Sequence, residues 1–154
     1  MLLWDCGASR YPIDAIELGY PITCIEFSDD ATHLILGGLD NAIHVVDLAT
    51  HERRFSLLGH THTVTSVALS HAGTRLVSAG MDDTVRIWDV QPFAASSRLL
   101  RTLHGMASGF ENLLLRARWS PDDEYVGSGS ADRTSNVWHV DKATPVSYTH
   151  LRAH

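Results

Sequence analysis

A repeat of 42 residues restricts the fold of this chain more than any other feature of its sequence. Four segments share two apolar residues followed by a polar one, and they are Leu3-Trp4-Asp5, Val45-Val46-Asp47, Ile87-Trp88-Asp89 and Val137-Trp138-His139. Their polar residues lie 42, 42 and 50 positions apart. Seven residues before the end of the last three segments an aspartate recurs, as Asp40, Asp82 and Asp132. A repeat of about 20–50 residues indicates one supersecondary unit stacked several times along the chain.

Each unit has the pattern of short strands rather than helices. Apolar residues alternate with polar ones in two corresponding segments, Ile43-His44-Val45 and Val85-Arg86-Ile87. This period of two is typical of strands whose two faces have different surroundings. Residues that favour tight turns recur at corresponding places, namely Ser28-Asp29-Asp30, Ser70-His71-Ala72-Gly73 and Ser120-Pro121-Asp122-Asp123. Four strands in about 42 residues make one blade of a β-propeller, so the sequence predicts an all-β fold of four-stranded antiparallel blades.

Composition limits the class of function. The chain has 154 residues, 44% of them hydrophobic, and no apolar run approaches the roughly 18 residues that a membrane helix needs. The 12 Lys and Arg against 18 Asp and Glu give a formal charge of −6 without a basic stripe, which is unfavourable for binding nucleic-acid phosphates. Cys6 and Cys24 are too few for a disulfide framework and match no metal spacing. We therefore expect an intracellular protein that acts by contacting other proteins.

Two dipeptides identify the repeat. Gly59-His60 precedes the strands of the middle unit and Trp88-Asp89 ends its third strand, a combination that resembles the WD-repeat family. The resemblance implies a structural tetrad of hydrogen-bonded side chains, which here falls on His60, Ser78, Asp82 and Trp88. The preceding repeat keeps only Asp40 of such a tetrad. The following repeat keeps Ser128, Asp132 and Trp138, with Phe110 in place of the histidine.

The same resemblance implies a ring of seven blades, for which this chain is short. Seven such repeats need about 294 residues, nearly twice the length present. We therefore expect a fragment of about three and a half blades, with a half blade at 1–18 and blades at 19–58, 59–105 and 109–146. Residues 147–154 depart from the repeat and resemble a translated library adapter more than a propeller strand, so they are predicted to be a tail outside the family pattern.

A narrower resemblance points to a function. Pro92-Phe93-Ala94 follows the middle unit, and Phe110-Glu111-Asn112-Leu113-Leu114 precedes the first strand of the next one. These segments are unusual among WD repeats and are similar to those of WD-repeat components of the spliceosome. The resemblance implies a nuclear, non-catalytic scaffold in pre-mRNA splicing that binds proteins of a large ribonucleoprotein complex. The alternative is a WD-repeat adaptor of another complex, such as a ubiquitin-ligase substrate receptor or a chromatin-complex subunit.

Three motifs admit a chemical interpretation, and each has a simpler structural one. His60, Ser78 and Asp82 are the residue types of a hydrolase triad, but in a tetrad they bond one another rather than a substrate. His60-Thr61-His62 offers two imidazoles to a metal without a nearby carboxylate or cysteine. Gly127-Ser128-Gly129-Ser130 lacks the lysine and the helix of a phosphate-binding loop. We therefore predict no catalytic, cofactor-binding or metal-binding residues, and no small-molecule substrate.

The tryptophans have two interpretations, a base-stacking set or a packed core. Three of them share one position at the end of the third strand and the fourth lies on an aligned first strand, the set being Trp4, Trp88, Trp119 and Trp138. Base stacking also requires flanking cations, which these strands largely lack. We therefore expect the tryptophans in the core between blades.

Protein contacts are expected from loops at the two rims of the blades, because loops on a rigid scaffold carry function. Part of an eight-residue insertion lengthens the loop at Gln91–Arg98 and offers Pro92 and Phe93 to a partner. The sequence equally allows Phe93 to pack on its own blade. On the opposite rim, loop residues beside the tetrad are candidates by position, and they are His62, Met81 and Asp83.

Overall fold

The computed structural model describes residues 1–5, 7, 10–94, 97–109, 111, 113–142 and 145–150, and the regular elements among them are all strands. The N-terminal sheet contains β1 (Leu2–Leu3) and β2 (Asp14–Ala15). The next contains β3 (Ile22–Phe27), β4 (His33–Gly38), β5 (Ala42–Asp47) and β6 (Arg53–Leu58). The third contains β7 (Val64–Leu69), β8 (Arg75–Gly80), β9 (Val85–Asp89) and β10 (Leu99–Leu103). The last contains β11 (Ala117–Trp119), β12 (Tyr125–Gly129), β13 (Thr134–His139) and β14 (Pro145–His150).

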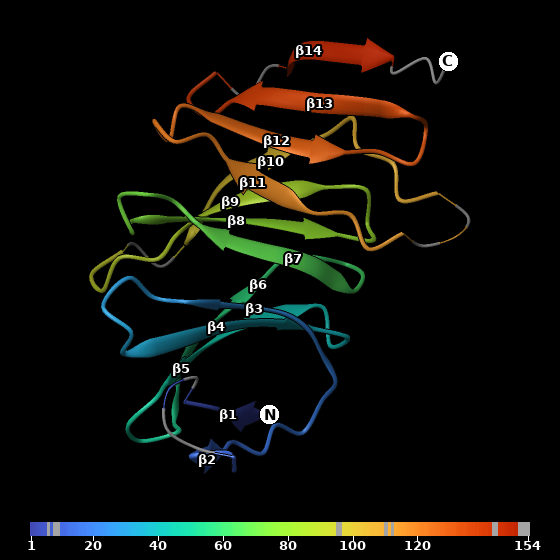
Figure 1. Ribbon diagram of the computed structural model, residues 1–154. Helices are drawn as coiled ribbons and strands as arrows, with labels where there is room; N and C mark the ends of the chain where they lie inside the picture. The colour runs from blue at the N-terminus through green and yellow to red at the C-terminus, as the bar shows by residue number, and fades with distance from the viewer. Residues whose placement is uncertain are drawn as a thin grey trace.

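Every sheet is an antiparallel meander, because strands that follow one another in the chain are also hydrogen-bonded neighbours. The sheets are stacked in chain order, so β1 and β14 lie at opposite ends of the stack (Figure 1). The first strands of successive four-stranded sheets, β3, β7 and β11, lie next to one another. This arrangement confirms the predicted all-β fold of four-stranded propeller blades, with three whole blades and a partial one. No helix among the described residues is long and apolar enough to cross a membrane.

The same turns recur in every whole blade. In the hairpin between the first two strands one residue has a φ between 54° and 68°, and these residues are Ala31, Gly73 and Asp123. In the next hairpin the corresponding residues, with φ between 58° and 68°, are Asn41, Asp83 and Arg133. Each of the latter follows a repeated aspartate, Asp40, Asp82 or Asp132, whose carboxylate accepts the backbone N–H two residues further on. The aspartate thus closes the turn and fixes the register of the hairpin.

The core lies between the blades. One cluster of buried aliphatic residues joins the β3–β6 blade to the β7–β10 blade and includes Trp88, and the next cluster includes Trp138. Trp119 is half-buried, and its indole N–H donates to the carbonyl of Ala68 in the preceding blade at 3.0 Å. Trp4 departs from the prediction, since it is 53% exposed. It extends from a sheet of only two strands, which leaves it without the packing surface that the other tryptophans have.

The strands fall within the predicted blade ranges except at the C-terminus. There β14 pairs with β13 as far as His150, four residues past the predicted blade end at 146. Pairing at a sheet edge uses backbone groups and requires little of the side chains. The prediction that 147–154 lies outside the repeat pattern therefore stays a prediction from sequence, and 151–154 lie outside the described residues.

Candidate functional site

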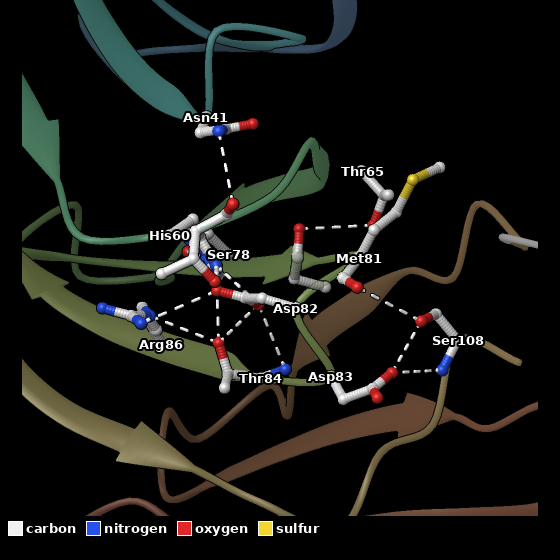
Figure 2. Close-up of polar contacts among 12 residues, drawn as sticks. Asn41, His60, Thr65, Ser78, Met81, Asp82, Asp83, Thr84, Arg86 and Ser108 are labelled. Carbon is white, nitrogen blue, oxygen red and sulfur yellow. Dashed lines mark hydrogen bonds and ion pairs between the residues drawn. The ribbon is translucent and has the colours of Figure 1, made fainter.

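Four side chains of the β7–β10 blade form one continuous hydrogen-bonded chain. His60 lies before β7, Ser78 lies on β8, Asp82 lies in the β8–β9 turn and Trp88 lies on β9. His60 Nδ1 lies 2.9 Å from a carboxylate oxygen of Asp82, and its Nε2 lies 2.8 Å from Ser78 Oγ (Figure 2). The indole N–H of Trp88 donates to the same Oγ at 2.8 Å. The structure therefore brings together the four residues that the resemblance to the WD-repeat family assigned to the tetrad.

Asp82 has more hydrogen-bond partners than the other three tetrad residues. Its carboxylate accepts hydrogen bonds from His60, from the backbone N–H of Thr61 at 3.0 Å and from the hydroxyl of Thr84 at 2.7 Å (Figure 2). The guanidinium of Arg86 lies 3.6 Å away as an ion-pair partner. Burial by itself raises the pKa of Asp82, but the hydrogen bonds outweigh burial and hold this pKa well below the usual value of a carboxyl group. Asp82 is therefore ionised at physiological pH.

This arrangement is suited to holding structure rather than to nucleophilic chemistry. Ser78 has no exposed surface, and its oxygen already bonds both Trp88 and His60. A catalytic serine needs an open approach beside oxyanion donors. We infer that the groups satisfy one another inside the blade, because a buried polar group without a partner costs about 1–3 kcal/mol. In the part of the chain that the structure describes, no three His, Cys, Asp or Glu side chains gather as a metal site.

The preceding blade has a different network, which sequence reasoning missed. Asp40 lies 2.6 Å from His44 Nε2, and His44 Nδ1 lies 2.7 Å from Ser56 Oγ. His44 is buried on β5, and the ring of Tyr20 packs against it with centroids 4.7 Å apart. In the next blade Arg86 occupies the corresponding position and likewise pairs with the turn aspartate. A basic residue four positions after the aspartate is the signal that the sequence offered.

The following blade replaces the histidine with a thioether. Ser128 Oγ lies 3.3 Å from Met106 Sδ and 3.0 Å from the carbonyl oxygen of Gly129, and these are the two acceptors open to its hydroxyl. Phe110, the residue predicted at this place, lies outside the described residues. The indole of Trp138 donates to the carbonyl of His104 at 3.1 Å and not to the serine. Counting from Gly105, which aligns with Gly59, would have assigned Met106. The predicted partial tetrad thus keeps its residue types but not the serine–tryptophan hydrogen bond.

The three rim candidates beside the tetrad differ in accessibility. His62 is exposed, and within the described residues its side chain has no hydrogen-bond or ion-pair partner. Met81 is half-buried. The carboxylate of Asp83 accepts both the backbone N–H and the hydroxyl of Ser108 at 2.6 Å, so it holds the loop that leads to the next blade (Figure 2). Of these three, His62 is therefore the residue most free to contact a partner.

The lengthened loop after β9 presents its aromatic residue to solvent. Phe93 is 99% exposed, so it does not pack on its own blade, and Pro92 beside it is also exposed. The base of the loop is fixed by Arg98, whose guanidinium donates to the carbonyls of Asp89 at 3.2 Å and Gln91 at 2.7 Å. The structure thus decides between the two interpretations that the sequence left open for Phe93.

Comparison with known proteins gives consistent matches. The family model described as "WD domain, G-beta repeat" matches residues 17–47, 51–89 and 97–139. Pre-mRNA-splicing factor cwf17 of Schizosaccharomyces pombe is 44% identical over 90% of this chain, and the U5 small nuclear ribonucleoprotein 40 kDa protein of Homo sapiens is 40% identical over 88%. The chain spans 40% and 38% of the lengths of these two relatives.

A solved structure agrees in fold. The β-propeller domain of Cps50 (Swd1) from Myceliophteria thermophila matches with a TM-score of 0.73 at 18% identity, over 88% of this chain and 42% of that one. The repeat in the sequence, the four-stranded blades and the matched family model cover the same three units. On these grounds the chain belongs to the WD40 repeat family.

Proposed function

We propose that this chain is part of a non-catalytic protein-interaction scaffold that works in pre-mRNA splicing, within a spliceosomal ribonucleoprotein of the nucleus. The likeness to two splicing proteins, at 44% and 40% identity over about nine-tenths of the chain, carries the proposal. A likeness that extends through three blades includes their rims as well as their cores. Rim loops on a rigid scaffold are where partners bind.

The described surface supports protein contacts over chemistry. The buried Ser–His–Asp groups bond one another, while apolar Phe93 and polar His62 stand free on opposite rims. The formal charge of −6 disfavours binding to nucleic acid or to anionic membrane surfaces. A few anchors of this kind can supply most of the binding energy of an interface. The partners are therefore proteins of the complex rather than nucleic acid, a membrane or a small-molecule substrate.

Affinity purification from nuclear extract with the tagged full chain tests the proposal. We expect large splicing proteins to be recovered, and Phe93→Ser to reduce their recovery more than the control Leu58→Ser, which removes an exposed apolar side chain elsewhere. Recovery of ubiquitin-ligase or chromatin proteins in place of splicing proteins would reject the splicing role and support the alternative adaptor role. Recovery of neither class would reject both.

A further inference from the structure

A pocket opens between two blades, away from the tetrad. Its volume is about 340 Å³, and it lies where the β3–β4 hairpin of one blade faces the β7–β8 hairpin of the next. The loop after β9 and the outer strand β6 complete its wall. Ligand pockets in proteins measure about 300–1,000 Å³, so this one is of a size to admit one or two side chains rather than a large cofactor.

The floor of the pocket is apolar. Ile35 and Val45 come from the first blade, and Leu69 and Val90 come from the second. All four belong to, or pack against, the hydrophobic cluster that joins the two blades. The pocket is therefore an opening in the inter-blade core, where an inserted apolar side chain would leave water for a hydrophobic surface already in place.

One side of the mouth is acidic, and we name Asp29 and Asp30 the acidic lip. The hydroxyl of Ser28, together with the backbone N–H and hydroxyl of Thr32, lowers the pKa of Asp30 to about 2, so this carboxylate is ionised at neutral pH. Asp29 is exposed, and within the described ranges its carboxylate has no hydrogen-bond or ion-pair partner. Asp29 Oδ2 lies 2.5 Å from where a Cβ on Gly73 would stand, so it points across the mouth toward the second blade.

The cations near the mouth are already engaged. Arg54 lies 3.5 Å from the carboxylate of Asp47. Arg98 lies over the ring of Phe55, with its central carbon 4.1 Å from the ring centroid, and donates to two loop carbonyls. Neither guanidinium is within ion-pair distance of Asp29 or Asp30 in the described structure. No arginine of the described residues therefore neutralises the acidic lip, and the exposed Asp29 is open to a cation of a ligand.

The other side of the mouth is aromatic. Phe55 and Pro92 line the pocket, and Phe93, next in the chain, stands outside the mouth with 99% of its surface exposed. Arg98 fixes the base of this loop from both sides, through its stacking on Phe55 and its hydrogen bonds to the loop backbone. Because the backbone at the base of the loop is held, covering Phe93 costs mainly the rotational freedom of its own side chain.

We propose that this pocket binds a linear segment of a partner protein in which a bulky apolar side chain lies one or two positions from a lysine or arginine. The apolar side chain enters the inter-blade floor, the cation meets the acidic lip, and the segment passes under Phe93. The inference rests on the scaffold function proposed above, because it assigns that scaffold one binding surface and the chemistry of its ligand.

Selection from a displayed library of random dodecapeptides on the full chain tests the ligand chemistry. We expect enrichment of sequences with an aromatic or large aliphatic residue one or two positions from Lys or Arg. Asp29→Lys should reduce the affinity of a selected peptide about fivefold through charge reversal at the rim. Phe93→Ser should reduce it about tenfold through loss of apolar contact. Glu52→Lys is the matched control, because Glu52 is exposed in the β5–β6 loop of the same blade but does not line the pocket, and it should leave the affinity within about twofold.

The outcomes separate this proposal from the function on which it rests. Enrichment of acidic or purely apolar peptides, no enrichment at all, or equal effects of Asp29→Lys and Glu52→Lys would overturn the pocket. A second experiment compares the splicing proteins that the tagged wild-type and Asp29→Lys chains recover from nuclear extract. Undiminished splicing proteins on that variant would reject the pocket while the scaffold function stands, and their absence from the wild-type purification would reject the scaffold function whatever the library shows.

Discussion

Replacing Ser78 by alanine removes one oxygen that two buried side chains share. Ser78 Oγ accepts the indole N–H of Trp88 at 2.8 Å and lies 2.8 Å from His60 Nε2. Because the ionised Asp82 sits against Nδ1 and takes its proton as a hydrogen bond, Nε2 is the acceptor of the serine hydroxyl. Ser78→Ala therefore leaves the Trp88 indole N–H and His60 Nε2 without a partner at a buried site.

The magnitude follows from these two groups. Each buried polar group without a partner costs about 1–3 kcal/mol. Part of this cost is offset, because alanine has no hydroxyl that must be removed from water on folding. We therefore expect a decrease of about 2–4 kcal/mol in the free energy of unfolding. For a protein of this length the melting temperature should fall by roughly 10 °C. Urea and thermal unfolding of the full chain, followed by tryptophan fluorescence, measure both quantities.

The next blade supplies the matched control. Ser128 is also buried on a second strand, but Trp138 donates to the carbonyl of His104, so Ser128→Ala leaves no indole unpaired. We expect Ser128→Ala to cost less than about 1 kcal/mol. Combining Ser78→Ala with Trp88→Phe should cost less than the sum of the single changes, since phenylalanine has no N–H to leave unpaired. Equal costs at the two serines, or strict additivity in the double variant, would refute this reasoning.

Three further changes are expected to have measurable effects. Gly80→Ala should lower the free energy of unfolding by about 1–3 kcal/mol, because the alanine Cβ would lie 2.5 Å from His60 Nδ1 and 2.8 Å from Asp82 Oδ1. Thermal melts measure this, and an unchanged melting temperature would contradict the packing described. The lowered pKa of Asp82 gives stability that is present above the ordinary carboxyl pKa of about 4 and is lost as the pH falls toward the folded-state value. The difference in unfolding free energy between wild type and Asp82→Asn should therefore shrink in acid. A difference that stays constant from pH 7 to 3 would contradict this linkage. Asp123→Ala should lose about 1 kcal/mol and speed amide exchange of the two N–H groups of the β7–β8 hairpin that its carboxylate accepts at 2.7 and 2.8 Å, whereas unchanged exchange there would show that this contact between blades is dispensable.

Local patterns were enough to predict the blades. Alternation of apolar and polar residues marks strands, and the repeated aspartate turns mark where each strand reverses, so the period alone places the sheets in chain order. The residues of the middle tetrad followed from the family resemblance, and the structure brings them together. Aligning the neighbouring repeats predicted the wrong residue at the histidine position of the last blade. The insertion changes the residue spacing there, so Met106 lies where Phe110 was predicted.

The amino-acid sequence by itself determined the period, the strands and the turns of this protein, because each depends on residues that are close neighbours in the chain. Only the tertiary structure decided which polar groups bond one another in the two flanking blades and which side chains stay exposed. His44 on β5 bonds Ser56 because β5 pairs with β6 at that position, and it also bonds Asp40 in the turn before β5. Phe93 is exposed on a loop whose base Arg98 connects to Phe55 of the preceding blade. The pocket lined by Phe55 and Pro92 exists only between two blades, so no single repeat encodes it.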